Sequence, residues 1–212
     1  KNSLGEENFD KSLKILDVGC AAGEFLYYVK KKTSIDDLSG MDIRPELLNK
    51  AKGLLKHVKF YKKDVLKNNS FKISTFDTIF MIGVHPIFDD FKKPFNNLIK
   101  WTKKRGKLYI CDMFNPYPVD VIIRYKLAKN NKSEQYETGW NNFSILSVSN
   151  FLKKNKKIKS FSFKKFDMPF DLKKNKSDPV RSWTIKEKKN TRLMTNGLCI
   201  IQNQILLTIN LK

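Results

Sequence analysis

Short apolar runs alternate with amphipathic stretches along the first half of the chain. The apolar runs have the length of buried strands and cover residues 14–18, 38–43, 58–61, 76–82 and 107–113. The stretches between them repeat apolar positions with the period of an α-helix and cover residues 24–32, 45–55 and 88–101. Strands that alternate with helices at this spacing predict an α/β fold with a parallel sheet covered on both faces.

The alternation is interrupted after residue 114 and then returns. The pattern predicts helices over residues 119–128 and 145–154, and strands over residues 159–166 and 202–211. Polar segments occupy much of residues 115–140 and 171–197. Because long loops inside compact domains are usually functional or disordered, we expect the substrate to bind there.

Composition is typical of one intracellular globular domain. The chain has 212 residues, 41% hydrophobic and 12% aromatic, which is too apolar for a disordered chain despite 30% charged residues. Cys20, Cys111 and Cys199 are far apart and show neither metal-ligand spacing nor a disulfide framework. No apolar run is long enough to span a membrane. These features predict a cytoplasmic protein without a metal site or membrane insertion.

The net charge of +21, with a pI near 9.8, has two interpretations. Such a balance is the electrostatic footprint of a nucleic-acid binder. However, the positive charge is almost all lysine and is spread along the chain. Arginine is better suited to phosphates and bases, because its planar guanidinium forms paired hydrogen bonds with them. A solvated lysine surface therefore stays as the alternative to an anionic substrate or nucleic acid.

The stretch LDVGCAAGEF, residues 16–25, predicts a strand, a glycine turn and a helix start. Gly19 allows a tight turn, and Gly23 lets the helix begin close to a ligand. A phosphate-binding GxxxxGK[ST] or a dinucleotide-binding GxGxxG is absent. The acidic Asp17 and Glu24 match a cationic ligand better than a pyrophosphate.

The same residues resemble the first motif of class I S-adenosylmethionine-dependent methyltransferases, an acidic residue followed by GxGxG. Here it begins at Asp17, and Ala21 replaces the middle glycine. Asp42 ends the second predicted strand, 19 residues beyond Gly23, and Asp64 ends the third. The resemblance covers about residues 14–113. It implies S-adenosylmethionine as cofactor and a Rossmann-like three-layer sandwich, whose mostly parallel seven-stranded sheet has an antiparallel C-terminal strand.

The resemblance also implies which residues bind the cofactor. Asp42 corresponds to the carboxylate that holds both ribose hydroxyls, and Asp64 to the acidic residue that meets the adenine amine. A lone aspartate after a strand is otherwise a helix cap or a turn residue. The implied cofactor-binding set is Asp17, Gly19, Cys20, Ala21, Gly23, Asp42, Ile43, Asp64, Val65 and Gly83. We expect one domain over residues 1–212, with a cofactor half at 14–113 and substrate-side insertions at 114–158 and 167–199.

His85 is the candidate catalytic residue. It follows the fourth predicted strand in Gly83-Val84-His85-Pro86, the segment that faces the methyl group in the resembled family. A neutral histidine is available near pH 7 as a general base or an acceptor-orienting group. The alternative is a histidine bonded to backbone at the end of the strand.

Two other motifs are weaker. The NPYP sequence at residues 115–118 is similar to the NPPY motif of enzymes that methylate base amino groups, but it follows the fifth strand rather than the fourth. Cys111 is similar in type to thiolates that attack pyrimidines, but it lies within a strand and is expected to be structural.

We expect the acceptor to meet aromatic and arginine side chains in the second half, namely Trp140, Arg181, Trp183 and Arg192, with Asn196 as a further candidate. Trp183 alternatively only anchors its loop. The chain loosely resembles bacterial methyltransferases of surface-polysaccharide pathways. This resemblance implies O-methylation of a small molecule, namely a sugar, sugar nucleotide or phosphoramidate-type precursor. The alternatives are an RNA methyltransferase and a non-catalytic module that keeps the fold.

Overall fold

The computed structural model describes residues 11–128, 135–187 and 191–212. The first half alternates strands and helices as the pattern predicts. Its elements are β1 (Ile15–Val18), α1 (Glu24–Lys32), β2 (Leu38–Asp42), α2 (Pro45–Leu54), β3 (Lys59–Lys62), β4 (Phe76–Ile82), the 3-10 turn η1 (His85–Ile87), α3 (Lys92–Trp101) and β5 (Thr102–Met113).

The second half completes the main sheet and adds two short hairpin-like pairs. Its elements are β6 (Arg124–Tyr125), β7 (Glu137–Thr138), α4 (Ile145–Lys154), β8 (Ile158–Lys165), β9 (Trp183–Lys186), β10 (Arg192–Thr195) and β11 (Gln204–Leu211). No helix in these described ranges is both long and apolar enough to cross a membrane.

The main sheet has seven strands in the order β3-β2-β1-β4-β5-β11-β8. The strands from β3 to β5 pair in parallel, whereas β11 pairs antiparallel with both β5 and β8. The predicted mostly parallel sheet with an antiparallel last strand is therefore confirmed. Because the order reverses beside β1, the carboxyl ends of β1 and β4 meet at a switch point, where open α/β sheets bind ligands.

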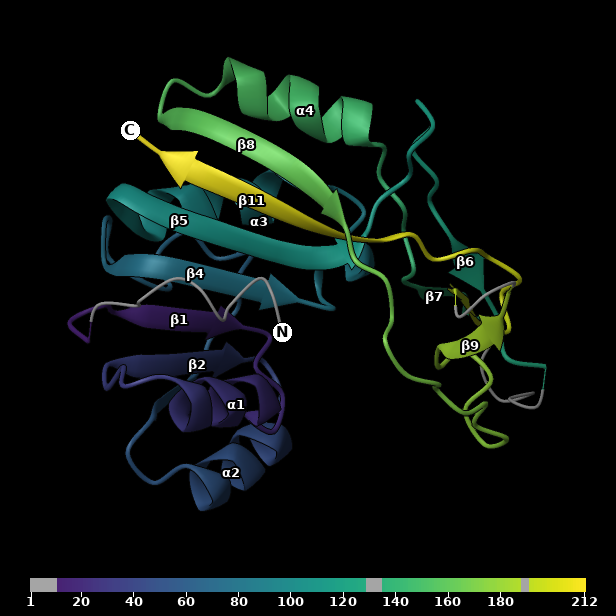
Figure 1. Cartoon of the computed structure of the whole chain (residues 1–212), viewed down its shortest axis with the longest axis horizontal. Helices are drawn as coiled ribbons and strands as arrows, with labels where there is room; N and C mark the ends of the chain where they lie inside the picture. Colours follow the sequence, from purple (N-terminus) through teal and green to yellow (C-terminus); the bar gives the residue numbers. More distant parts are fainter. Residues whose placement is uncertain (1–10, 129–134, 188–190) are drawn as a thin grey trace.

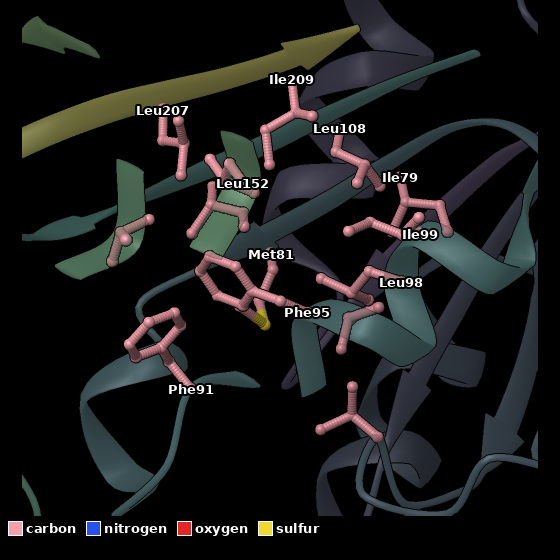
Figure 2. Packing of buried hydrophobic residues seen from close by; sticks show 14 of the residues in the cluster. Ile79, Met81, Phe91, Phe95, Leu98, Ile99, Leu108, Leu152, Leu207 and Ile209 are labelled. Carbon is pink, nitrogen blue, oxygen red and sulfur yellow. The ribbon is translucent and has the colours of Figure 1, made fainter. Parts of the chain in front are cut away.

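Helices cover both faces of the sheet at its centre, so β1, β2 and β4 are mostly buried on both sides, whereas the edge strands β3 and β8 are largely exposed. One apolar cluster packs α3 and α4 against β4, β5 and β11, and Figure 2 shows its side chains converging on Met81 and Phe95. A second cluster packs α1 and α2 against β1, β2 and Phe80 of β4. This double burial explains why the strands were recognisable as apolar runs.

The two short strand pairs lie outside the three layers. Antiparallel pairing joins β6 to β7 and β9 to β10. In Figure 1, β6, β7 and β9 lie beyond the end of the sheet toward which the arrows of β1, β2 and β4 point. The segments that carry these short strands thereby lie at the carboxyl ends of the central strands.

Three expectations for individual elements were wrong. Residues 119–128 form no helix, because the backbone amides of Val121 and Ile123 bond to Asn142 and to the Asn141 side chain instead. The helix expected from residue 88 begins at Lys92, after η1. The polar segment 171–197 contains the β9–β10 pair, which its charged sequence did not reveal.

Helix α2 offers a matched test of its packing. Leu48 is 3% exposed and Leu54 is 50% exposed. We expect Leu48→Ala to lower the free energy of unfolding by about 2–5 kcal/mol, because the cavity it leaves is in the core. Leu54→Ala, the control, should cost well under that range. Urea unfolding measures the loss of stability in both variants, and equal losses would contradict the buried face that the structure gives α2.

Candidate functional site

The turn after β1 has two glycines and one alanine with left-handed backbone conformations. The φ angle is 72° at Gly19, 46° at Ala21 and 88° at Gly23. Such angles favour glycine, because a Cβ crowds the neighbouring carbonyl. At Gly19 packing adds a second requirement, since a Cβ there would lie 2.3 Å from Cγ2 of Val84. Ala21 accepts the same backbone conformation with only a methyl group as side chain.

Hydrogen bonds hold this turn against the end of β2. The amides of Gly19 and Cys20 donate to the carbonyl of Met41, over 2.8 and 3.0 Å. The amide of Ala21 donates to Oδ2 of Asp42 over 3.0 Å. The other carboxylate oxygen of Asp42 accepts the amide two residues later, over 2.9 Å. Asp42 is therefore fixed in place beside the turn, and its ribose-binding role stays a prediction.

The site carries concentrated negative charge in a buried setting. Burial, followed by the nearby carboxylates of Asp42 and Glu24, raises the pKa of Asp17 to about 7. Burial, followed by Asp17 and Asp42, also raises the pKa of the Cys20 thiol to about 12, so this thiol stays protonated. A cationic ligand would relieve the repulsion among these carboxylates.

The third predicted acidic residue lies in a turn after β3. Oδ1 of Asp64 accepts the amide of Leu66 over 2.8 Å, an arrangement that both the turn and the ligand interpretations allow. Val65 is buried, and its carbonyl accepts a hydrogen bond from Asn97 of α3 over 2.7 Å. Ile43, beside Asp42, is 59% exposed.

A cavity of about 750 Å³ opens at the carboxyl ends of β4 and β5. Gly83 lines it, with φ 68° and open space where a Cβ would stand. Side chains from the second half of the chain complete the wall, including Tyr125, Trp140, Met168 and Ser182. Gly83 is thus the predicted cofactor-site residue that reaches the cavity.

One wall of the cavity is an aromatic and aliphatic surface made by neighbouring strands. Phe80 of β4 stacks on Tyr109 of β5, with ring centroids 5.0 Å apart and planes 13° apart. Phe25, which follows the glycine turn on α1, packs on Phe80 with centroids 4.8 Å apart. Leu206 of β11 extends the same wall. The turn and the cavity are therefore joined through Phe25.

His85 lies behind this cavity rather than in its wall. Its side chain is 0% exposed and stacks on Phe114, with ring centroids 4.6 Å apart. Neither imidazole nitrogen has a hydrogen-bond partner within the described ranges. Its Nδ1 is 3.8 Å from Oδ2 of Asp112, which does line the cavity. In this arrangement His85 contacts the cavity through Asp112.

The residues predicted to bind the acceptor are dispersed. Trp140 lines the cavity. Arg192 bonds to Asp171 through Nε over 2.6 Å, and Trp183 lies under Nζ of Lys174 at 4.7 Å, so both side chains are engaged away from the cavity wall.

Arg181 and Asn196 are also absent from the cavity wall. Arg181 is exposed beside a separate surface hollow. Asn196 is buried, and its side chain accepts the amide of Leu198 and donates to the carbonyl of Val180. Its contacts are those of a residue that shapes its loop.

Sequence reasoning missed several residues of the cavity wall. Asp42 ends β2 and Asp112 is the second-last residue of β5, so an acidic residue near a strand end was the available signal. Gln202 and Gln204 carry no such signal in the sequence. Cys111, expected to be structural, lines the cavity, and burial followed by Asp112 raises its thiol pKa to about 11. That pKa disfavours a thiolate nucleophile.

A family model described as a methyltransferase domain matches residues 9–160. The chain belongs to this family. It is a methyltransferase, and the glycine turn, Asp42 and Gly83 all lie within the matched range. No curated protein matches the sequence.

Solved structures share the methyltransferase fold over nearly the whole chain. A putative S-adenosylmethionine-dependent methyltransferase from Listeria monocytogenes has a TM-score of 0.63 at 10% identity, covering 98% of this chain and 94% of that one. YcgJ from Bacillus subtilis gives 0.62 at 12% identity, covering 95% and 92%. A methyltransferase from Methanosarcina mazei gives 0.61 at 14% identity, covering 96% and 94%. At these identities the similarity establishes the fold.

Because the pKa of the buried Asp17 is raised, we expect this residue to release a proton when S-adenosylmethionine binds. Below its pKa of about 7 this carboxyl is mostly protonated, and a cationic ligand favours the ionised form. Binding should therefore release protons near pH 6–7, and affinity should rise with pH up to about 7. Calorimetry in buffers of different ionisation enthalpy measures this release. Asp17→Asn should abolish it, whereas an unchanged release in that variant would assign the proton to another group.

Proposed function

We propose that this methyltransferase transfers a methyl group from S-adenosylmethionine to an oxygen atom of a small-molecule acceptor bound in the cavity. The observation that carries the proposal is the cavity of about 750 Å³, which adjoins the glycine turn through Phe25 and Gly83. That volume lies in the range of pockets that enclose small ligands.

The residues at the end of the sheet fit S-adenosylmethionine. Its sulfonium and ammonium groups are cationic, and Asp17, Glu24 and Asp42 form an acidic cluster. The open space at Gly83 leaves room for a ligand at the cavity wall. The Listeria monocytogenes and Methanosarcina mazei proteins of the same fold are described as dependent on this cofactor. We assign the ribose hydroxyls to Asp42 and the adenine side to Ile43, Asp64 and Val65.

When bound, S-adenosylmethionine supplies an electrophilic methyl group. The chain's own contribution is to hold an acceptor oxygen in line with that group and to exclude water, and such positioning can account for much of the catalysis. The stacked Phe80 and Tyr109 offer a flat face for an acceptor. Ser182 donates to Gln202 over 2.7 Å, which orients that amide at the cavity wall.

Among the acceptors expected from the sequence, an uncharged sugar or similar hydroxyl compound fits this wall best. Aromatic faces and amide side chains suit a sugar ring. Arg181 and Arg192, which favoured a phosphorylated precursor, stand outside the wall. The link to surface polysaccharide rests on the sequence resemblance alone.

The RNA methyltransferase alternative finds less support than the small-molecule proposal. An RNA acceptor needs a basic groove, and the cavity wall contains no lysine or arginine among the described residues. The wall draws instead on both proposed insertions, 114–158 and 167–199, which we assign to acceptor binding.

We place the enzyme in the cytoplasm, since its three cysteines are free, as in a reducing compartment.

A labelling experiment distinguishes the two acceptor classes. The enzyme is incubated with methyl-tritiated S-adenosylmethionine and either a small-molecule extract or total RNA. We expect label in small molecules only. Label transferred to RNA would contradict the proposal.

Asp42→Ala is the matched loss-of-function variant for that experiment, because its carboxylate holds the turn. We expect at least a tenfold loss of affinity for S-adenosylmethionine. Asp36→Ala, an exposed carboxylate before the opposite end of β2, is the control and should behave as wild type. Equal affinities in the two variants would contradict the assignment of Asp42.

The proposed role of His85 as general base is tested by His85→Phe. Loss of a general base reduces turnover by about 10²–10⁴-fold. Because the ring is buried beside Phe114 and does not line the cavity, we expect less than a tenfold loss in kcat and no loss of stability. A loss of 10²-fold or more, with unchanged melting temperature, would establish His85 as the base.

A further inference from the structure

The cavity wall differs in charge from the rest of the protein. Of the 212 residues, 42 are lysine or arginine and 21 are aspartate or glutamate, giving a net charge of +21. Yet none of the described residues that line the cavity is lysine, arginine or histidine, and Asp112 is the one carboxylate among them. The wall consists mainly of aromatic, aliphatic and methionine side chains, and its uncharged polar groups come from glutamine, serine, threonine, cysteine, tyrosine and tryptophan.

Asp112 is rigidly held at this wall. Oδ2 accepts the backbone amide of His85 over 3.2 Å, and Oδ1 accepts the amide of Met113 over 3.0 Å. The residue is 5% exposed. Each carboxylate oxygen has a second lone pair, so the group retains capacity to accept a hydrogen bond from a ligand.

Arg124 is hydrogen-bonded to a residue of the wall, but its charge is already neutralised by a carboxylate. Arg124 donates to Thr138, a residue of the wall, over 2.9 Å. Its other terminal nitrogen pairs with Asp89 over 2.7 Å, and Asp89 in turn accepts from Thr138 and Asn141. The guanidinium of Arg124 is therefore paired with a carboxylate, and neither of these two residues lines the cavity.

These observations determine which ligand charge the cavity tolerates. An anion buried here would lose its hydration without gaining a cationic partner, and it would face the carboxylate of Asp112. A cation would gain that carboxylate together with aromatic faces such as Tyr109 and Trp140. An uncharged hydroxyl compound would donate a hydrogen bond to Asp112 and pack against the apolar wall.

We infer that the acceptor site selects by charge. It takes an uncharged or cationic small molecule with an apolar or aromatic face and excludes anions, and Asp112 determines this selection by accepting a hydrogen bond from the acceptor. This inference rests on the proposed function, because it names the acceptor class of that same cavity. Phosphorylated sugars and nucleotide sugars are thereby excluded as acceptors.

The test uses three probes that share one aromatic body and differ in charge: 2-phenylethanol, 2-phenylethylammonium and phenylacetate. Equilibrium dialysis at pH 7 measures their dissociation constants for the enzyme saturated with S-adenosylhomocysteine. We expect the alcohol and the ammonium compound to bind at least tenfold more tightly than the carboxylate. Phenylacetate binding as tightly as the alcohol would overturn the inference, and so would the absence of binding by all three probes.

Asp112→Asn assigns the selection to one residue. This variant should weaken binding of the ammonium probe at least tenfold and leave the alcohol within about threefold. Asp167→Asn is the matched control, since Asp167 lies between the wall residues Phe166 and Met168 but its own side chain is 75% exposed and paired with Lys165. An unchanged affinity for the ammonium probe in Asp112→Asn, or the same loss in Asp167→Asn, would contradict the role of Asp112.

Parallel titration with S-adenosylhomocysteine separates the two possible failures. If the cofactor product binds and the probes show no preference, the charge-selection inference fails and the methyltransferase proposal stands. If the product does not bind to the folded wild type, the proposed function fails, and the inference that rests on it fails as well. The wild-type probe series decides the question even if Asp112→Asn does not fold.

Discussion

The hydrogen bonds between the glycine turn and the end of β2 are the constraint on which the site depends. The amides of Gly19 and Cys20 bond to the Met41 carbonyl, and that of Ala21 bonds to the Asp42 carboxylate. They hold the start of α1 close to the carboxyl edge of the sheet. Phe25 is thereby brought onto Phe80, so the cofactor side and the acceptor cavity share one wall. A turn that moved away from β2 would separate the two halves of the site.

Much of the fold could be predicted from the sequence, because strands buried on both faces appear as uninterrupted apolar runs. Helices α1 and α4 and strand β4 have the predicted bounds, since each combines a clear period with a clear boundary. Residues 119–128 misled the prediction because their apolar side chains resemble a helix, whereas their amides bond to residues 141–142, a distant partner that no local pattern encodes.

The two sides of the candidate site differed in predictability for a physical reason. The proposed cofactor side is formed by strands and the turns after them, and parallel strands bring all their carboxyl ends to one edge, so Asp17, Asp42 and Gly83 could be expected near one another. The acceptor side is assembled from loops far apart in the chain. Residue type alone suggested Arg192, but the ion pair with Asp171 that engages it depends on tertiary structure. Gln204 reaches the wall through the pairing of β11 with β5, and Gln202, which precedes that strand, is held by a hydrogen bond from its backbone amide to the Met194 carbonyl. Local sequence specifies neither contact.

The charge of the surface and the charge of the cavity have different consequences. Lysines on the exterior give the protein its high pI, whereas the charged groups among the described residues of the turn and the cavity wall are carboxylates. The acidic cluster at the turn suits a cationic cofactor, and the apolar wall suits an acceptor without negative charge. Net charge therefore describes the solvated exterior of this enzyme and is a poor guide to its substrate.

The central claim is that the cofactor presents its reactive end to the aromatic cavity at Gly83. A crystal structure of the enzyme with S-adenosylhomocysteine tests this claim most directly. We predict that the ligand's sulfur lies beside Gly83 and faces the cavity bounded by Phe80 and Tyr109, with the ribose hydroxyls on Asp42. A sulfur atom that faces the lysine-rich exterior instead, with the cavity closed off from it, would contradict the account.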